Sequence, residues 1–121
     1  MIENLYELIG GHQTIAAATD CFYERVLEDE KLRDFFRRTD MAHLRSRQIM
    51  FISMLLGGGV YTGKDIRGAH TLSREHGLTD AHFDLFIEHF RAALREVGVA
   101  AENIEKIVKP LERKRKAILD T

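Results

Sequence analysis

The chain has 121 residues, of which 45% are hydrophobic and 31% charged, as in one globular domain spanning residues 1–121. Its formal net charge of −1 argues against broad electrostatic binding to nucleic acid. The single cysteine, Cys21, excludes an internal disulfide and favours a reducing compartment. No apolar run is long enough to cross a membrane and no signal peptide is visible, so we expect a cytoplasmic protein without a membrane partner.

Helical periodicity dominates the chain, and glycines divide it into five or six predicted helices. A short helix over 4–9 precedes a long one over 13–28. The long helix has an apolar face made of Ile15, Thr19, Phe22, Tyr23, Val26 and Leu27. A short turn follows within residues 30–38.

Capping residues define the next predicted helices. Thr39 or Asp40 can begin a third helix, which continues to Leu56 and ends at the three glycines that follow. Between Asp65 and Gly77 we predict a shorter helix that carries His70.

Two further helices complete the predicted fold. Thr79 caps a helix whose apolar stripe ends before Gly98, and the last helix extends from Ile104 to Leu119 with a kink at Pro110. The basic run at 113–116 suits a solvated face near a helix end better than a nucleic-acid site. We therefore predict an all-α single domain.

Three polar side chains interrupt the apolar faces of these helices: Tyr23, Gln48 and His70. Burial of such groups without partners costs a few kcal/mol each. They either form one satisfied network in the core or surround a cofactor with a polar centre and an apolar rim. The helix faces by themselves favour the network.

The residue pattern limits which cofactor could lie there. The six histidines, at positions 12, 43, 70, 76, 82 and 89, include no pair three or four residues apart, so a structural zinc site is not expected. Haem needs only one protein nitrogen and otherwise binds through apolar burial. No nucleophile–histidine arrangement or phosphate-binding glycine loop is apparent, and we interpret Cys21 as a packed thiol.

Several stretches, taken in order, resemble the group I truncated haemoglobins, which are short globins with a two-over-two helical sandwich around a haem. They are "LYELIGG", "FYERVLEDEKLRDFFRRTDMA", "GGGVYTGKDIRGAH", "HGLTDAHFD" and the helix with Pro110. The resemblance covers nearly the whole chain. It favours the cofactor interpretation over the core network.

The resemblance implies a role for each matching residue. His70 would be the proximal iron ligand, Tyr23 and Gln48 the distal hydrogen-bond donors, and Leu44 the apolar residue that keeps water out. Further haem contacts would come from Phe36, Phe51, Tyr61, Ile66 and Phe83. Arg47 would either pair with a haem propionate or extend into solvent.

The chain also departs from some relatives. Arg47 stands where certain members have a distal histidine, and Ile52 where some have a phenylalanine that gates a gas tunnel. Some members bind a haem vinyl group covalently through a histidine in the last helix. Residues 112–119, "ERKRKAIL", contain no histidine. We therefore expect non-covalent haem b.

The resemblance implies reversible binding of oxygen at ferrous iron, for storage, transport or sensing, with nitric oxide and carbon monoxide as further ligands. The alternative is an enzyme of the nitric oxide dioxygenase type, which would oxidise nitric oxide to nitrate and need a reductase. A peroxidase-like activity is a weaker third. We expect a monomer or a weak homodimer, and a non-haem helical bundle remains the outside alternative.

Overall fold

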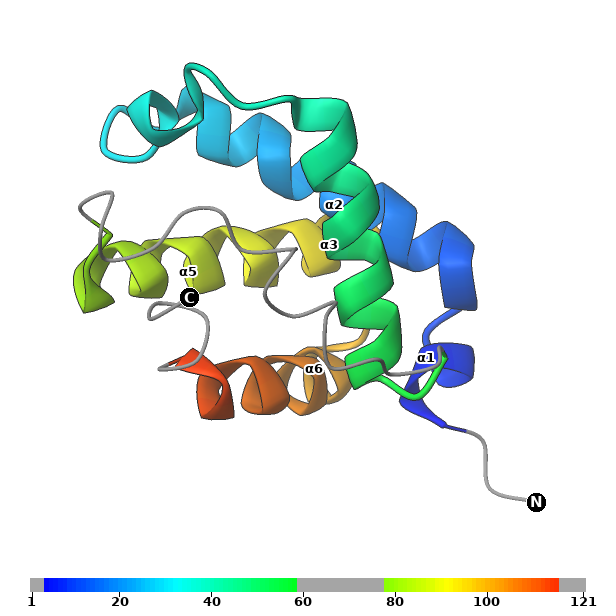
Figure 1. The fold of residues 1–121 in the computed structure, drawn as a ribbon. Coiled ribbons are helices and arrows are strands. Elements are labelled where there is room, and N and C mark those ends of the chain that lie inside the picture. The colour runs from blue at the N-terminus through cyan, green and yellow to red at the C-terminus, as the bar shows by residue number, and fades with distance from the viewer. Residues whose placement is uncertain (1–3, 59–77, 116–121) are drawn as a thin grey trace.

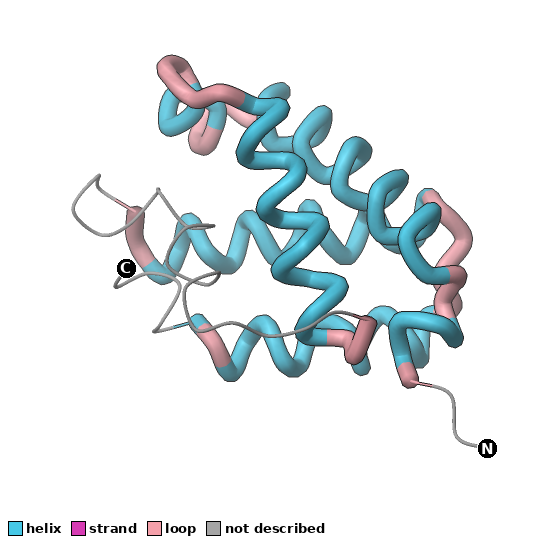
Figure 2. The backbone as a smooth tube through the Cα atoms, turned by 45° about the vertical axis from the view of Figure 1, so that its right-hand side comes forward, coloured by secondary structure: helices cyan, strands magenta, loops and turns pink. Residues whose placement is uncertain are grey.

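The computed structural model describes residues 4–58 and 78–115, and within these ranges every regular element is a helix (Figure 2). The elements are α1 (Leu5–Leu8), α2 (Gly11–Glu28), the 3₁₀ helix η1 (Arg33–Phe36), α3 (Met41–Leu55), α5 (Asp80–Glu96) and α6 (Ala101–Arg113). The all-α prediction is confirmed. The predicted helix around His70 lies outside the described residues, as does the end of the predicted last helix.

The helices begin and end close to the predicted positions because the signals are local. The Asp40 carboxylate accepts the His43 N–H at the start of α3, so Asp40 rather than Thr39 is the cap. At the start of α5, Thr79 and His82 form a reciprocal capping box. Gly98 follows α5 with φ +91°, a backbone conformation that glycine adopts without strain.

The four long helices form two layers (Figure 1). In one layer α2 and α3 cross each other, and in the other α5 and α6 run antiparallel. Helix α2 packs against both α3 and α5. The large core between the layers contains aliphatic and aromatic residues from these helices, including Ile15, Phe51, Ile52, Phe83, Ile87, Phe90, Leu94, Ile104, Ile107 and Val108.

A second, smaller group of buried residues lies where the end of α2 meets η1 and the start of α3. We call it the Tyr23 cluster; it consists of Tyr23, Val26, Leu32, Phe36 and Leu44. Phe22, Phe35, Met41, Leu85 and Phe86 pack around it while remaining partly exposed. Helix α5 therefore contributes to the large core and also to the edge of the Tyr23 cluster.

The predicted apolar face of α2 is wrong at one position. Leu27 is 40% exposed, whereas Val26 is fully buried. Consecutive residues are about 100° apart around a helix, so Val26 lies near the middle of the apolar face and Leu27 at its edge, where it is left partly uncovered. Ala18, which the prediction omitted, is fully buried instead.

Helix α1 lies beside the carboxyl end of α3 in both ribbon views (Figures 1 and 2). The Tyr6 N–H donates to the Leu56 carbonyl at 3.1 Å, and the Asn4 side-chain amide donates to the Gly57 carbonyl at 2.9 Å. A Cβ at Gly58 would lie 2.3 Å from the Tyr6 ring, so only glycine permits this approach. The contact holds the exit of α3 in place.

Among the described helices, none combines the length and the apolar character that a membrane-spanning segment needs.

Candidate functional site

Tyr23 faces inward from α2, as predicted, and is 8% exposed. Its ring meets the Phe22 ring at 4.9 Å and the Phe36 ring at 6.1 Å, both edge to face. Burial raises the pKa of the Tyr23 phenol well above its usual range, so the hydroxyl keeps its proton. No hydrogen bond joins this hydroxyl to another described residue, and its oxygen is not among the fully buried polar atoms of the described residues that lack a partner.

The structure brings Tyr23 together with two other predicted site residues, Phe36 and Leu44. Tyr23 comes from α2, Phe36 from η1 and Leu44 from the first turn of α3, and all three belong to the Tyr23 cluster. Phe36 also packs edge to face on Phe86 of α5, with ring centroids 6.1 Å apart. Tyr23, Phe36 and Leu44 thus contribute to one largely apolar wall that contains a single phenol.

Gln48 lies one helical turn after Leu44 on α3 and is partly buried. Phe51 lies almost one turn further and is 1% exposed, but it belongs to the large core rather than to the Tyr23 cluster. Phe83, near the start of α5, is also part of the large core. The predicted haem contacts within the described residues are therefore divided: Phe36 and Leu44 belong to the Tyr23 cluster, and Phe51 and Phe83 to the large core.

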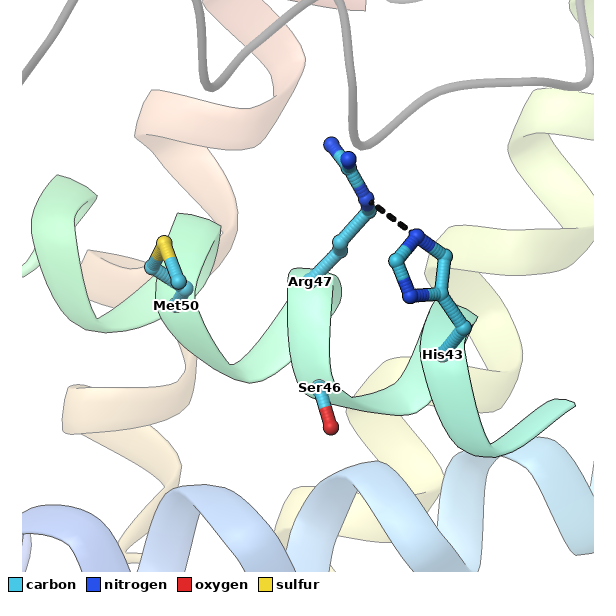
Figure 3. A pocket seen from close by; sticks show the side chains of 4 residues that line it. All are labelled: His43, Ser46, Arg47 and Met50. Carbon is cyan, nitrogen blue, oxygen red and sulfur yellow. Dashed lines mark hydrogen bonds between the residues drawn. The ribbon is translucent and has the colours of Figure 1, made fainter.

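A surface pocket of about 250 Å³ lies on α3, and His43, Ser46, Arg47 and Met50 line its described part (Figure 3). The Arg47 Nε–H donates to His43 Nε2 at 2.8 Å. Figure 3 shows the Arg47 guanidinium extending away from α3 on the same side as His43, whereas Ser46 points the other way. Arg47 is partly buried, and this bond leaves its terminal N–H groups available.

Tyr61, Ile66 and His70 lie outside the described residues, so their predicted roles stay predictions. The described residues fit an apolar cofactor with one polar edge. They provide apolar side chains at Phe36 and Leu44, a largely buried phenol at Tyr23, and the Arg47 guanidinium in a surface pocket on α3.

Cys21 is not an activated nucleophile. Its thiol donates to Glu96 Oε2 at 2.6 Å, and burial together with this carboxylate raises the thiol pKa to about 11. The thiol is therefore protonated at neutral pH, which argues against a catalytic role, and the residue itself is partly exposed.

Sequence reasoning missed two polar contacts between distant segments. Arg115 was placed on a solvated face, but it pairs with Asp80, Asp84 and Glu112 and lies 4.6 Å above the Phe83 ring. The expectation of a solvated face is wrong for this residue. His89 Nε2 lies 2.8 Å from Asp29 Oδ2, although the two residues are 60 positions apart in the sequence. The Arg115–Glu112 pair has a local i,i+3 spacing, but no local pattern could have revealed the contacts of Arg115 with α5 or that of His89 with Asp29.

Comparisons with known proteins agree with this architecture. The sequence matches the family described as bacterial-like globin over residues 4–120. The group 1 truncated hemoglobin of Tetrahymena pyriformis is 40% identical over 118 residues, which cover 97% of this chain and 95% of that protein. A group 1 truncated hemoglobin of Synechocystis is 40% identical over 108 residues, 88% of this chain and 87% of that protein.

Solved structures give the same result. The crystal structure of the T. pyriformis truncated hemoglobin in its Fe(III) form superposes with a TM-score of 0.85 at 39% identity, covering 98% of this chain and 100% of that chain. The 2/2 hemoglobin of Synechococcus, in the cyanomet state with covalently attached heme, gives a TM-score of 0.86 at 35% identity, covering 97% and 98%.

Proposed function

This chain belongs to the group 1 truncated haemoglobins of the bacterial-like globin family, haem proteins that bind diatomic ligands, and we propose that it binds oxygen reversibly at ferrous haem b. When bound, the haem supplies an iron that coordinates the diatomic ligand. The residues of the chain hold the cofactor, exclude water and stabilise the ligand. The observation that supports the oxygen-binding role best is the Tyr23 phenol, which faces inward, keeps its proton and makes no hydrogen bond to another described residue.

On the proximal side, we assign His70 as the iron ligand. A neutral imidazole gives one ring nitrogen to a metal, while its other N–H needs an acceptor that fixes the ring orientation. The assignment rests on the sequence, in which His70 holds the matching place within "GKDIRGAH".

On the distal side, Tyr23 donates a hydrogen bond to the partially negative ligand. A hydrogen bond to a charged acceptor contributes about 1.5–3 kcal/mol, and about 1.4 kcal/mol slows release tenfold. One bond from Tyr23 is therefore sufficient to retain oxygen strongly. Gln48 supplies a second donor from α3, and Leu44 excludes water between them.

The remaining assigned residues form the wall and rim of the haem site. Phe36, Phe51, Tyr61, Ile66 and Phe83 provide the apolar contacts. Arg47 pairs with a propionate through its terminal N–H groups, since its Nε–H is already bonded to His43. Carbon monoxide and nitric oxide would occupy the same place as oxygen.

We propose that the haem is held without a covalent bond. The Synechococcus relative has covalently attached heme, but this chain has no histidine after His89. Acid acetone should therefore extract all the haem from the reconstituted protein. Haem that remains with the chain would contradict this proposal.

The absorption spectrum of the ferrous protein, with and without carbon monoxide, tests the function directly. We expect a strong band that shifts when carbon monoxide is added. His70→Ala should lose haem readily, whereas His12→Ala, an exposed residue of α2, should retain it. A purified protein that stays colourless after incubation with haem would overturn the proposal.

A second measurement separates oxygen binding from catalysis. The oxygenated protein is mixed with nitric oxide, with and without a reductase. Reversible oxygen binding predicts at most one reaction per haem in either mixture. Sustained conversion of nitric oxide to nitrate in the presence of the reductase would instead favour the dioxygenase alternative.

A further inference from the structure

Asp29 is the C-cap residue of α2, and its backbone and side chain both accept hydrogen bonds from the turn that leads into η1. Its carbonyl accepts the N–H groups of Leu32 and Arg33, at 3.0 and 2.9 Å. Its carboxylate Oδ1 accepts the Lys31 N–H at 2.9 Å. The position of this turn therefore depends on how Asp29 itself is held.

His89 of α5 holds Asp29 from the other layer of the fold. Its Nε2 lies 2.8 Å from Asp29 Oδ2, and the two side chains are 20% and 18% exposed. Hydrogen bonds from His89 and from the Lys31 N–H lower the pKa of the Asp29 carboxyl, so the carboxylate is charged at neutral pH. A charged carboxylate only accepts, which means that His89 Nε2 carries the proton and donates.

The turn is connected to the candidate ligand site over a few residues. It leads directly into η1, which carries Phe36, and Phe36 packs on Tyr23. Phe86 lies almost one turn before His89 on α5 and packs on Phe36. Helix α5 thus holds the distal wall at two points, by an aromatic contact at Phe86 and by a hydrogen bond at His89.

We propose that His89 is a positioning residue for the distal wall: through Asp29 it holds the turn between α2 and η1, and thereby keeps Tyr23 and Phe36 at their places over the bound ligand. The inference rests on the proposed function, because Tyr23 is taken as the donor to that ligand. His89 itself does not touch the ligand. Its removal should loosen the wall without removing any group from it.

The test compares His89→Leu with His89→Gln, whose amide can still donate to Asp29. Two signals are recorded: amide hydrogen exchange at Lys31, Leu32 and Arg33, and the C–O stretching band of the ferrous carbon monoxide complex. Loss of a hydrogen bond to a charged acceptor should speed exchange at the turn by about tenfold or more in His89→Leu. The C–O band should shift or broaden and oxygen release should accelerate, and His89→Gln should restore most of each signal.

Arg91→Gln is the matched control on the same helix. Arg91 binds Glu105 of α6 at 3.1 and 3.0 Å and has no such link to the turn. This variant should leave exchange at the turn and the C–O band as in the wild type. A C–O band that moves equally in Arg91→Gln and His89→Leu would overturn the proposal, since the effect would then be general loosening.

Asp29→Asn provides an independent variant in case His89→Leu folds poorly. The amide keeps an acceptor but loses the charge, so we expect a smaller change in the same direction at both signals. If the wild-type holoprotein and either variant show the same turn exchange and the same C–O band, the positioning role is wrong while the haem function stands. A wild-type chain that takes up no haem would instead overturn the proposed function.

Discussion

The large core and the Tyr23 cluster are both buried, yet they differ in composition. The large core consists of aliphatic and aromatic side chains between the two layers. The Tyr23 cluster has a phenol among four apolar residues, and its hydroxyl has no partner within the described parts of the chain. This phenol distinguishes the Tyr23 cluster, where we propose that the ligand binds, from the large core.

Truncation of the large core should give the largest effect on stability. Ile107 is 1% exposed, and Ile107→Ala should lower the free energy of unfolding by about 2–5 kcal/mol, measured by urea denaturation. The folded fraction should release oxygen at the wild-type rate.

Leu32→Ala is the counterpart in the Tyr23 cluster. Leu32 is fully buried, so a loss of the same order is expected, but oxygen release should also change because the wall rearranges. If both variants altered oxygen release alike, the division between the two regions would be wrong.

Tyr23→Phe should change function more than stability. Removal of the hydroxyl should speed oxygen release by about tenfold or more, since one bond to a charged acceptor is lost. Urea denaturation should show stability unchanged or slightly increased. Oxygen release is measured by stopped-flow replacement with carbon monoxide.

Tyr6→Phe makes the same chemical change on α1, where the ring packs against Gly58. Its oxygen release should match that of the wild type. An unchanged release rate in Tyr23→Phe would show that another residue is the distal donor.

Thr79→Ala should have a moderate effect on both regions at once. Thr79 caps α5, and α5 contributes to the large core and to the edge of the Tyr23 cluster. Loss of the cap should cost about 1 kcal/mol of unfolding free energy. Thr79→Ser, which keeps the hydroxyl, should restore it, and a Thr79→Ala variant as stable as the wild type would show that the capping box is dispensable.

Protonation of the paired carboxylates should have the smallest effect on stability. It should leave the thermal midpoint unchanged at neutral pH and lower it progressively in acid. Hydrogen bonds from His89, Arg91 and Arg45 lower the pKa values of Asp29, Glu105 and Asp20, respectively. A lowered folded-state pKa contributes stability that is present above the unfolded value, about 3.9–4.3, and is lost as pH falls through the folded value. Thermal midpoints should therefore be nearly constant from about pH 7 to 5 and fall below about pH 4.

Two variants compare the regions in acid. Asp29→Asn and Glu105→Gln should each flatten the acid loss, because each removes one titrating carboxyl. Only Asp29→Asn should also move the C–O band, since Asp29 leads into η1 and Glu105 lies on α6. A shift of the C–O band in Glu105→Gln would contradict the assignment of this signal to the Tyr23 cluster alone.

The candidate site was predictable in part. Tyr23 and Leu44 were expected on the distal side and Phe36 against the haem, and the three residues lie in one cluster. The partner of Arg47 was not expected, although His43 precedes it by four residues, a spacing that brings helical side chains together. Arg115 was misplaced because its acidic partners come partly from the start of α5, which is distant in the sequence.

The sequence by itself determined the described helices, the cap at Thr79 and the glycine that follows α5, because these signals act within one or two turns, while the structure chose Asp40 over Thr39. It also determined that Tyr23 faces inward. Only the tertiary structure decided which neighbour each face meets: it left Leu27 exposed and joined Asp29 to His89. The physical reason is that helix periodicity defines an apolar stripe, whereas the crossing of the helices decides which part of the stripe is covered.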